Sequence, residues 1–145
     1  MNEKIKELQD IIDHANHIVF FTGAGVSTAS GIPDFRSTDG LYNQKYQFPP
    51  EEILSHHFFL QQTKEFFSFY RDKMLYPNVQ PSYVHRYIAS LEKRQKKVTV
   101  ITQNIDGLHQ LAGSTNVLEL HGSVLRNTWQ KPKLTGKQTN KKKLI

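Results

Sequence analysis

The fold is decided by the stretch Thr22-Gly23-Ala24-Gly25-Val26-Ser27-Thr28-Ala29-Ser30-Gly31-Ile32-Pro33-Asp34-Phe35-Arg36, which directly follows the apolar run Ile18-Val19-Phe20-Phe21. An apolar run that ends in Gly-x-Gly predicts a buried strand followed by a tight turn with free backbone N–H groups. Such a turn can hold a pyrophosphate at the start of a helix. The long polar continuation to Arg36 is not needed to close a turn, which indicates a loop that contacts a ligand.

The glycine pattern alone is a weak signal for a dinucleotide. Thr28 stands where the usual fingerprint has its third glycine or alanine, and no acidic residue follows at the usual spacing. A plain strand-to-helix turn is therefore the competing interpretation of Gly23 to Gly25. Ser27 and Thr28 could cap the following helix, donate to phosphate, or do both.

Two further strands are predicted downstream, and polar residues follow each of them. Residues 98–102 are rich in β-branched side chains and lead into Gln103-Asn104-Ile105-Asp106-Gly107-Leu108-His109. Residues 117–120 lead into His121-Gly122-Ser123. Polar groups at the carboxyl ends of neighbouring strands meet where open α/β sheets bind ligands. The competing interpretations are an Asx-capped turn at Asn104 and a structural role for His121.

The remaining elements alternate with these strands. Residues 2–16 form a predicted amphipathic helix with Ile5, Leu8, Ile11, Ile12 and Ala15 on one face. A helix start is expected at 49–52, a long aromatic helix over 57–75, a Ser82-capped helix through 93, and a short helix over 108–112. This order predicts an α/β fold with a partial Rossmann-like parallel sheet and flanking helices.

Composition separates the chain into two parts. The segment 128–145 carries six lysines and no acid, whereas residues 1–127 carry equal numbers of basic and acidic groups. The predicted division is therefore a domain over 1–127 and a basic, disordered tail over 128–145. The absence of cysteine excludes a thiolate zinc site. No apolar run is long enough for a membrane span or a signal peptide, so a soluble cytoplasmic protein is expected.

Taken together, Gly-Ala-Gly-x-Ser-x-x-Ser-Gly-Ile-Pro-Asp-Phe-Arg, Gln-Asn-Ile-Asp and the later His-Gly resemble the sirtuins, the NAD-dependent protein-lysine deacylases. The resemblance runs from about residue 2 to 127. It implies an acyl-lysine protein substrate and the release of nicotinamide and O-acyl-ADP-ribose. The residues that it assigns to NAD are Gly23, Ala24, Gly25, Thr28, Asp34, Phe35, Arg36, Gln103, Asn104, Ile105, Asp106 and His121.

The resemblance also implies individual roles. The matching Phe35 walls the nicotinamide end of the pocket, and the matching Asp106, with Ile105, holds the nicotinamide carboxamide. His121 is the expected general base, because an imidazole that titrates near neutrality suits proton removal from a ribose hydroxyl. His109 is expected to be structural.

The chain departs from the family after residue 127, where sirtuins continue into a zinc module and the second half of the sheet. We therefore expect a truncated and impaired member, with an uncovered sheet edge and marginal stability or aggregation. Two alternatives stay open. One is a non-catalytic module that binds NAD or ADP-ribose, and the other is non-specific nucleic-acid binding through the lysine-rich tail.

Overall fold

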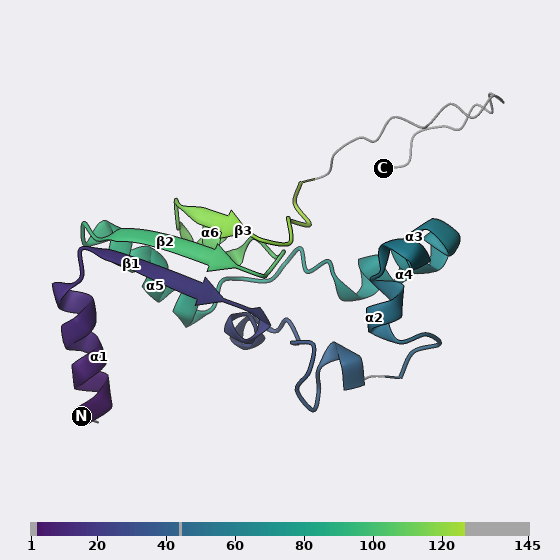
Figure 1. Cartoon of the computed structure of the whole chain (residues 1–145), viewed down its shortest axis with the longest axis horizontal. Coiled ribbons are helices and arrows are strands. Elements are labelled where there is room, and N and C mark those ends of the chain that lie inside the picture. The colour runs from purple at the N-terminus through teal and green to yellow at the C-terminus, as the bar shows by residue number, and fades with distance from the viewer. Residues whose placement is uncertain (1–2, 44, 127–145) are drawn as a thin grey trace.

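A computed structural model describes residues 3–43 and 45–126 of the chain. The tail predicted over 128–145 lies outside the described residues. Figure 1 shows a parallel sheet with helices against it, a helix at the N-terminus, and a separate helical group. The prediction of a partial α/β parallel sheet with flanking helices is confirmed.

The sheet has three strands in the order β1-β2-β3, namely β1 (His17–Thr22), β2 (Lys97–Thr102) and β3 (Val117–Glu119). All pairs are parallel, with Thr22 opposite Thr102 and Thr102 opposite Glu119. The three strands therefore end at the same edge. This register brings the loops that follow Thr22, Thr102 and Glu119 together.

One face of the sheet is covered by α5 (Tyr83–Lys93), with α6 (Leu108–Ala112) packed beside α5. Buried side chains alternate along β2, which is typical of a strand with one covered face. The core between the sheet and its helices contains Ile12, Ile88, Leu91, Val98 and Val100. As predicted, Ser82 caps α5, and its hydroxyl accepts the N–H of His85.

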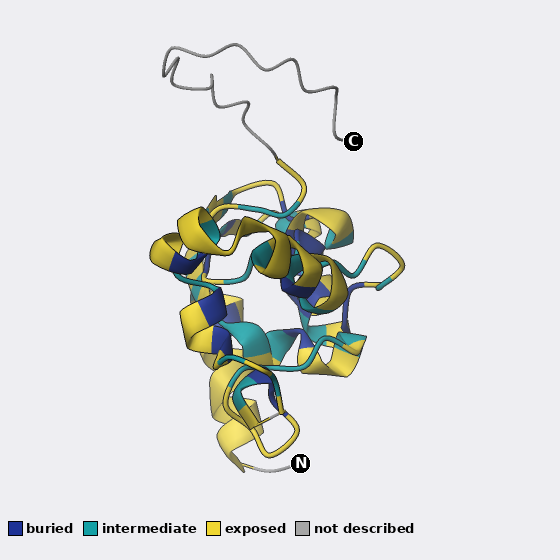
Figure 2. Ribbon diagram, turned by 90° about the vertical axis from the view of Figure 1, so that its right-hand side faces the viewer, coloured by how far each residue is buried: buried dark blue, intermediate teal, exposed yellow. Residues whose placement is uncertain are grey.

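The opposite face of the sheet is bare among the described residues. Val19, Phe21 and Leu118 are 54%, 65% and 51% exposed. The N-terminal helix α1 (Glu3–His14) also contributes little to the core, because only Ile12 of its apolar stripe is buried. Figure 2 shows this helix, next to the N mark, mostly in the colour of exposed residues. The predicted helix is confirmed, and Ile5, Leu8 and Ile11 of its apolar face are exposed.

The aromatic segment forms a second, smaller core. Pro50 is the first residue of α2 (Pro50–Ile53), as its position before two acids predicted. The helix expected over 57–75 is instead two helices, α3 (His56–Gln61) and α4 (Thr63–Lys73). No helix in the described ranges is long and apolar enough to cross a membrane.

The break between α3 and α4 has a local cause. Gln62 adopts φ −125° and ψ 50°, which is outside the helical region, and the chain turns there. The turn lets Phe59 of α3 contact Phe66 and Phe67 of α4, with ring centroids 5.0 and 5.9 Å apart. Edge-to-face aromatic contacts of this kind stabilise packing by about 1 kcal/mol each. The aromatic contacts between α3 and α4 therefore outweigh the free energy that one continuous helix through Gln62 would gain.

Candidate functional site

The glycine-rich segment turns sharply at the end of β1. Two short 3-10 turns follow the strand, over Ala24–Val26 and Thr28–Ser30, and Gly31 ends the second with φ 91°. The predicted α-helix after Gly-x-Gly is therefore replaced by 3-10 turns. A Cβ added at Gly23 or Gly25 would meet no atom of the described residues within 4 Å. Both glycines thus face open space.

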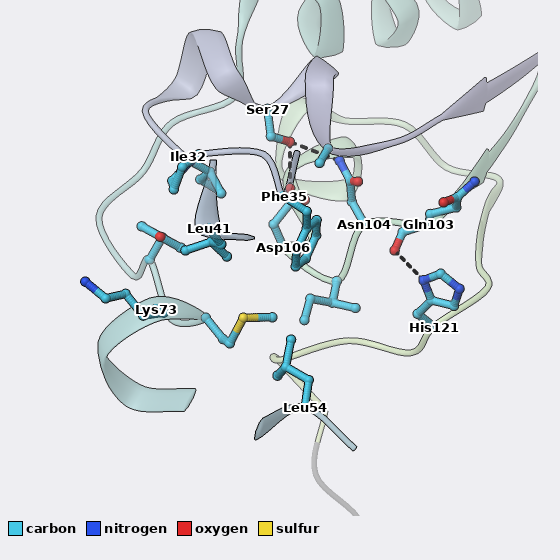
Figure 3. Close-up of a pocket in the computed structure, with 15 residues that line it drawn as sticks. Ser27, Ile32, Phe35, Leu41, Leu54, Lys73, Gln103, Asn104, Asp106 and His121 are labelled. Atoms are coloured by element: carbon cyan, nitrogen blue, oxygen red, sulfur yellow. Dashed lines mark hydrogen bonds between the residues drawn. The ribbon is translucent and has the colours of Figure 1, made fainter. Parts of the chain in front are cut away.

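The loop after β2 holds this turn in place. The Asn104 side-chain amide donates to the Gly23 carbonyl and to Ser27 Oγ, both at 3.1 Å. Ser27 Oγ in turn donates to Asp106 Oδ2 at 2.6 Å (Figure 3). Ser27 is 1% exposed, so its hydroxyl is used within the protein and caps no helix. The two motifs, some 80 residues apart in sequence, form one hydrogen-bonded unit.

Asp34 organises the loop that carries Phe35. Its carboxylate accepts the Ser37 N–H at 2.9 Å, and hydrogen bonding to Ser37 lowers the pKa of Asp34. Gly40 packs against the same residues, because an added Cβ would lie 2.8 Å from both Asp34 Oδ1 and the Phe35 carbonyl carbon. The ring of Phe35 contacts that of Tyr42, with centroids 5.4 Å apart. The loop therefore holds Phe35 through local contacts.

His121 follows β3, at the same edge of the sheet. Its Nδ1 lies 3.0 Å from the Gln103 carbonyl oxygen. Because a carbonyl only accepts, Nδ1 carries the proton in this contact and the neutral ring has its lone pair on Nε2. The imidazole is exposed, so Nε2 is accessible to a ligand. This is the tautomer that a general base needs.

These loops and the helical group enclose a pocket of about 400 Å³. Figure 3 shows side chains from both sides directed into it. The predicted residues that line it are Ala24, Phe35, Gln103, Asn104, Ile105, Asp106 and His121. An adjoining cavity takes in Gly25, Asp34 and Arg36. Gly23 and Thr28 line neither cavity, and Thr28 Oγ1 instead donates to the Gly25 carbonyl.

Several lining residues escaped the sequence analysis, namely Ile32, Pro33, Leu41, Leu54, Lys73, Met74 and Tyr76. Ile32 and Pro33 lie within the quoted motif and could have been included. Leu54, Lys73, Met74 and Tyr76 come from the helical group, whose position beside the sheet no local pattern indicates. Lys73 pairs with Asp72 at 3.0 Å, and this contact raises the pKa of Lys73.

Comparison with known proteins identifies the family to which this chain belongs. The Sir2 family model matches residues 23–143. An NAD-dependent protein deacetylase of Clostridium perfringens is 57% identical over 129 residues, which are 88% of this chain and 53% of that protein. A solved Sir2 enzyme superposes with a TM-score of 0.75 at 45% identity, over 85% of this chain and 48% of that one.

A solved complex of a Sir2 homologue with NAD is also similar, with a TM-score of 0.68 and 40% identity over 81% of this chain and 45% of that one. The protein belongs to the Sir2 family, as the resemblance predicted. The chain spans about half the length of the curated relatives and solved structures that it matches.

Proposed function

We propose that this chain binds NAD, with the nicotinamide in the pocket between the sheet and the helical group and the diphosphate on the glycine turn. The observation that carries the proposal is the convergence of Phe35, Asn104, Asp106 and His121 on one pocket beside an open Gly-x-Gly turn. The Sir2 homologue solved with NAD supports it.

The residues present suit the two ends of such a ligand. Gly25 is exposed and faces open space, so a phosphate can approach its backbone without meeting a side chain. Ile32, Phe35 and Ile105 give the pocket apolar surfaces for an aromatic ring. The Asp106 carboxylate accepts from Ser27 and from the Leu108 N–H, and a carboxylate has about four lone-pair positions. It therefore retains capacity for a carboxamide donor.

Each residue then has a distinct role. Asp106 and Ile105 hold the carboxamide, Gln103 and Asn104 address the neighbouring ribose, and Phe35 excludes water from one side of the pocket. His121 removes a ribose hydroxyl proton through Nε2 while its Nδ1–H stays on the Gln103 carbonyl. When bound, NAD would supply the nicotinamide–ribose bond that an acyl transfer breaks.

The whole-protein reaction that we propose is NAD-dependent removal of acyl groups from protein lysines. Its support is the curated relative named NAD-dependent protein deacetylase. The second candidate is NAD or ADP-ribose binding without turnover. The favouring observation is that the chain spans 53% of that relative.

Nicotinamide release from NAD tests the proposal. The purified full chain is incubated with NAD, with and without an acetyl-lysine peptide, beside His121→Ala and the control His57→Ala. His57 is an exposed histidine on α3 outside the pocket, so its loss should change nothing. Peptide-dependent release that only His121→Ala abolishes would support catalysis.

Saturable NAD binding without release would favour the binding module instead. If folded protein neither binds NAD nor releases nicotinamide, both candidate functions are wrong.

A further inference from the structure

Two buried histidines lie beneath the glycine turn and have no part in the function proposed above. His85 of α5 is 0% exposed and His109 of α6 is 1% exposed. Their rings meet edge to face, with centroids 4.6 Å apart. Buried imidazoles are costly unless their nitrogens are used, so the contacts of this pair need an explanation.

Each ring anchors one flank of the turn. His109 Nε2 lies 3.0 Å from Thr22 Oγ1, and Thr22 is the residue directly before Gly23. His85 Nδ1 accepts the Ser82 N–H at 3.1 Å, and Ser82 Oγ donates to the Val26 carbonyl at 3.0 Å. The pair thus reaches the turn at its entry through Thr22 and at its exit through Ser82.

These contacts require neutral rings. Because His85 Nδ1 accepts a backbone N–H, its single ring proton is on Nε2. His85 Nε2 and His109 Nδ1 have no hydrogen-bond partner in the described part of the chain. Burial lowers the pKa of both rings, and for His109 burial and the neighbouring His85 lower it to about 4. Asp106 opposes both shifts, whereas Arg86 adds to that of His85.

We propose that His85 and His109 are positioning residues that fix the Gly23–Ser27 turn from both flanks in the geometry that receives the ligand's diphosphate. The inference rests on the proposed function in one respect, namely that this turn holds a diphosphate. Neither ring lines the pocket, so both act through Thr22 and Ser82.

Protonation should release the turn. A second proton on His85 occupies Nδ1, which can then no longer accept the Ser82 N–H and can only donate, to Ser82 Oγ at 2.8 Å. Two imidazolium rings at 4.6 Å would also repel each other in this buried position. Ligand affinity should therefore fall as pH decreases toward about 4, the pKa of His109.

The test combines two measurements on the full chain. Titration calorimetry gives the Kd for ADP-ribose across this pH range, and ¹H–¹⁵N spectra follow the backbone amides of Gly23 and Gly25 without ligand. The anchor variants are Thr22→Val and His109→Leu. The conservative variants are Thr22→Ser, which retains the hydroxyl, and His109→Gln, which retains a polar atom near Nε2 but cannot be protonated.

Two controls separate positioning from stability. Leu91→Ala removes a buried core side chain without touching the turn, and His17→Gln removes an exposed histidine at the far end of the sheet. Thr22→Val and His109→Leu should shift both glycine amides and weaken ADP-ribose binding about tenfold, the loss expected for one hydrogen bond. The conservative variants and both controls should bind as the wild type, and His109→Gln should flatten the pH profile.

The proposal is overturned if the glycine amides of the anchor variants keep their wild-type shifts. It is also overturned if Leu91→Ala weakens binding as much as His109→Leu. If the wild type does not bind ADP-ribose, the proposed function fails, but the amide shifts still decide whether the histidines position the turn.

Discussion

Two glycines near the pocket show how one residue type serves different purposes. Gly40 is required by the protein itself, since a Cβ there would meet Asp34 and the Phe35 backbone at 2.8 Å. Gly25 has no such neighbour among the described residues and no left-handed φ. The fold can therefore accept a side chain at Gly25, and the ligand approach proposed above gives a reason for glycine there.

Gly25→Ala should thus separate binding from stability. We expect an unchanged or slightly raised free energy of unfolding, by up to about 1 kcal/mol, because alanine restricts the unfolded chain. NAD binding should weaken by at least about tenfold, since the methyl group fills the approach to the backbone. Urea unfolding and calorimetric titration measure the two effects.

Gly40→Ala is the matched comparison, and it should destabilise the loop that carries Phe35. A Gly25→Ala variant that binds NAD as tightly as the wild type would remove the ligand-based explanation of this glycine.

The buried His109 predicts a pH dependence of stability. Its pKa is 6.5 in the unfolded chain and about 4 in the folded one. Between these two pH values His109 is protonated in the unfolded state and neutral in the folded state. The free energy of unfolding therefore falls as pH decreases. The slope approaches about 1.4 kcal/mol per pH unit, and the contribution is constant above pH 6.5.

Urea midpoints measured at several pH values check this dependence. His109→Gln should lose the part of the slope that the imidazole causes, whereas His14→Gln, which changes an exposed histidine, should keep it. Equal slopes in the wild type and His109→Gln would show that His109 is not the titrating group.

At the scale of elements, the N-terminus of α5 links the core to the site. Ser82 is the N-cap in a capping box with His85, and its hydroxyl also reaches the Val26 carbonyl. Ser82→Ala should lower the free energy of unfolding by about 1–2 kcal/mol through the lost cap. Ser90→Ala, on the same helix, removes a bond only to Tyr87 and should cost less. Thermal unfolding of both variants makes the comparison.

Local patterns predicted most elements because each had its own signal. The Ser82 cap, the Pro50 start and the β-branched run of β2 all stand at the predicted positions. The break at Gln62 was missed because aromatic contacts between α3 and α4 override helix propensity, and no turn residue marks it. The exposure of the apolar stripe of α1 could not be predicted, because an amphipathic pattern does not reveal whether a packing partner is present.

The candidate site was predictable to the extent that its residues lie in three motifs, each of which follows a strand. Parallel register at Thr22 and Thr102 then brings Ala24 and Asn104 together. The wall formed by Leu54 and Met74 was not predictable, because it depends on how a separate helical core docks beside the sheet. The hydroxyl of Ser27 was misassigned because its partner Asp106 is distant in sequence.

For the molecule as a whole, the bare sheet face has consequences for solution behaviour. Val19, Phe21 and Leu118 form part of an exposed apolar surface that soluble monomers rarely present, and Ile5, Leu8 and Ile11 add a second on α1. We expect the chain to self-associate, as the sequence already suggested. Sedimentation velocity should show concentration-dependent association that Phe21→Thr reduces while the circular dichroism spectrum is unchanged.

A polar substitution on an already charged surface, such as Glu7→Gln on α1, serves as the control. A monomer at all concentrations, with a sharp cooperative thermal transition, would contradict this prediction.

The central claim is that the pocket beside the glycine turn binds NAD. Its most direct test is calorimetric titration of NAD into the folded full chain and into Gly25→Ala. The account predicts saturable binding with one site per chain for the wild type and at least about tenfold weaker binding for the variant. Folded wild-type protein that shows no saturable binding, or equal binding by both proteins, would contradict it.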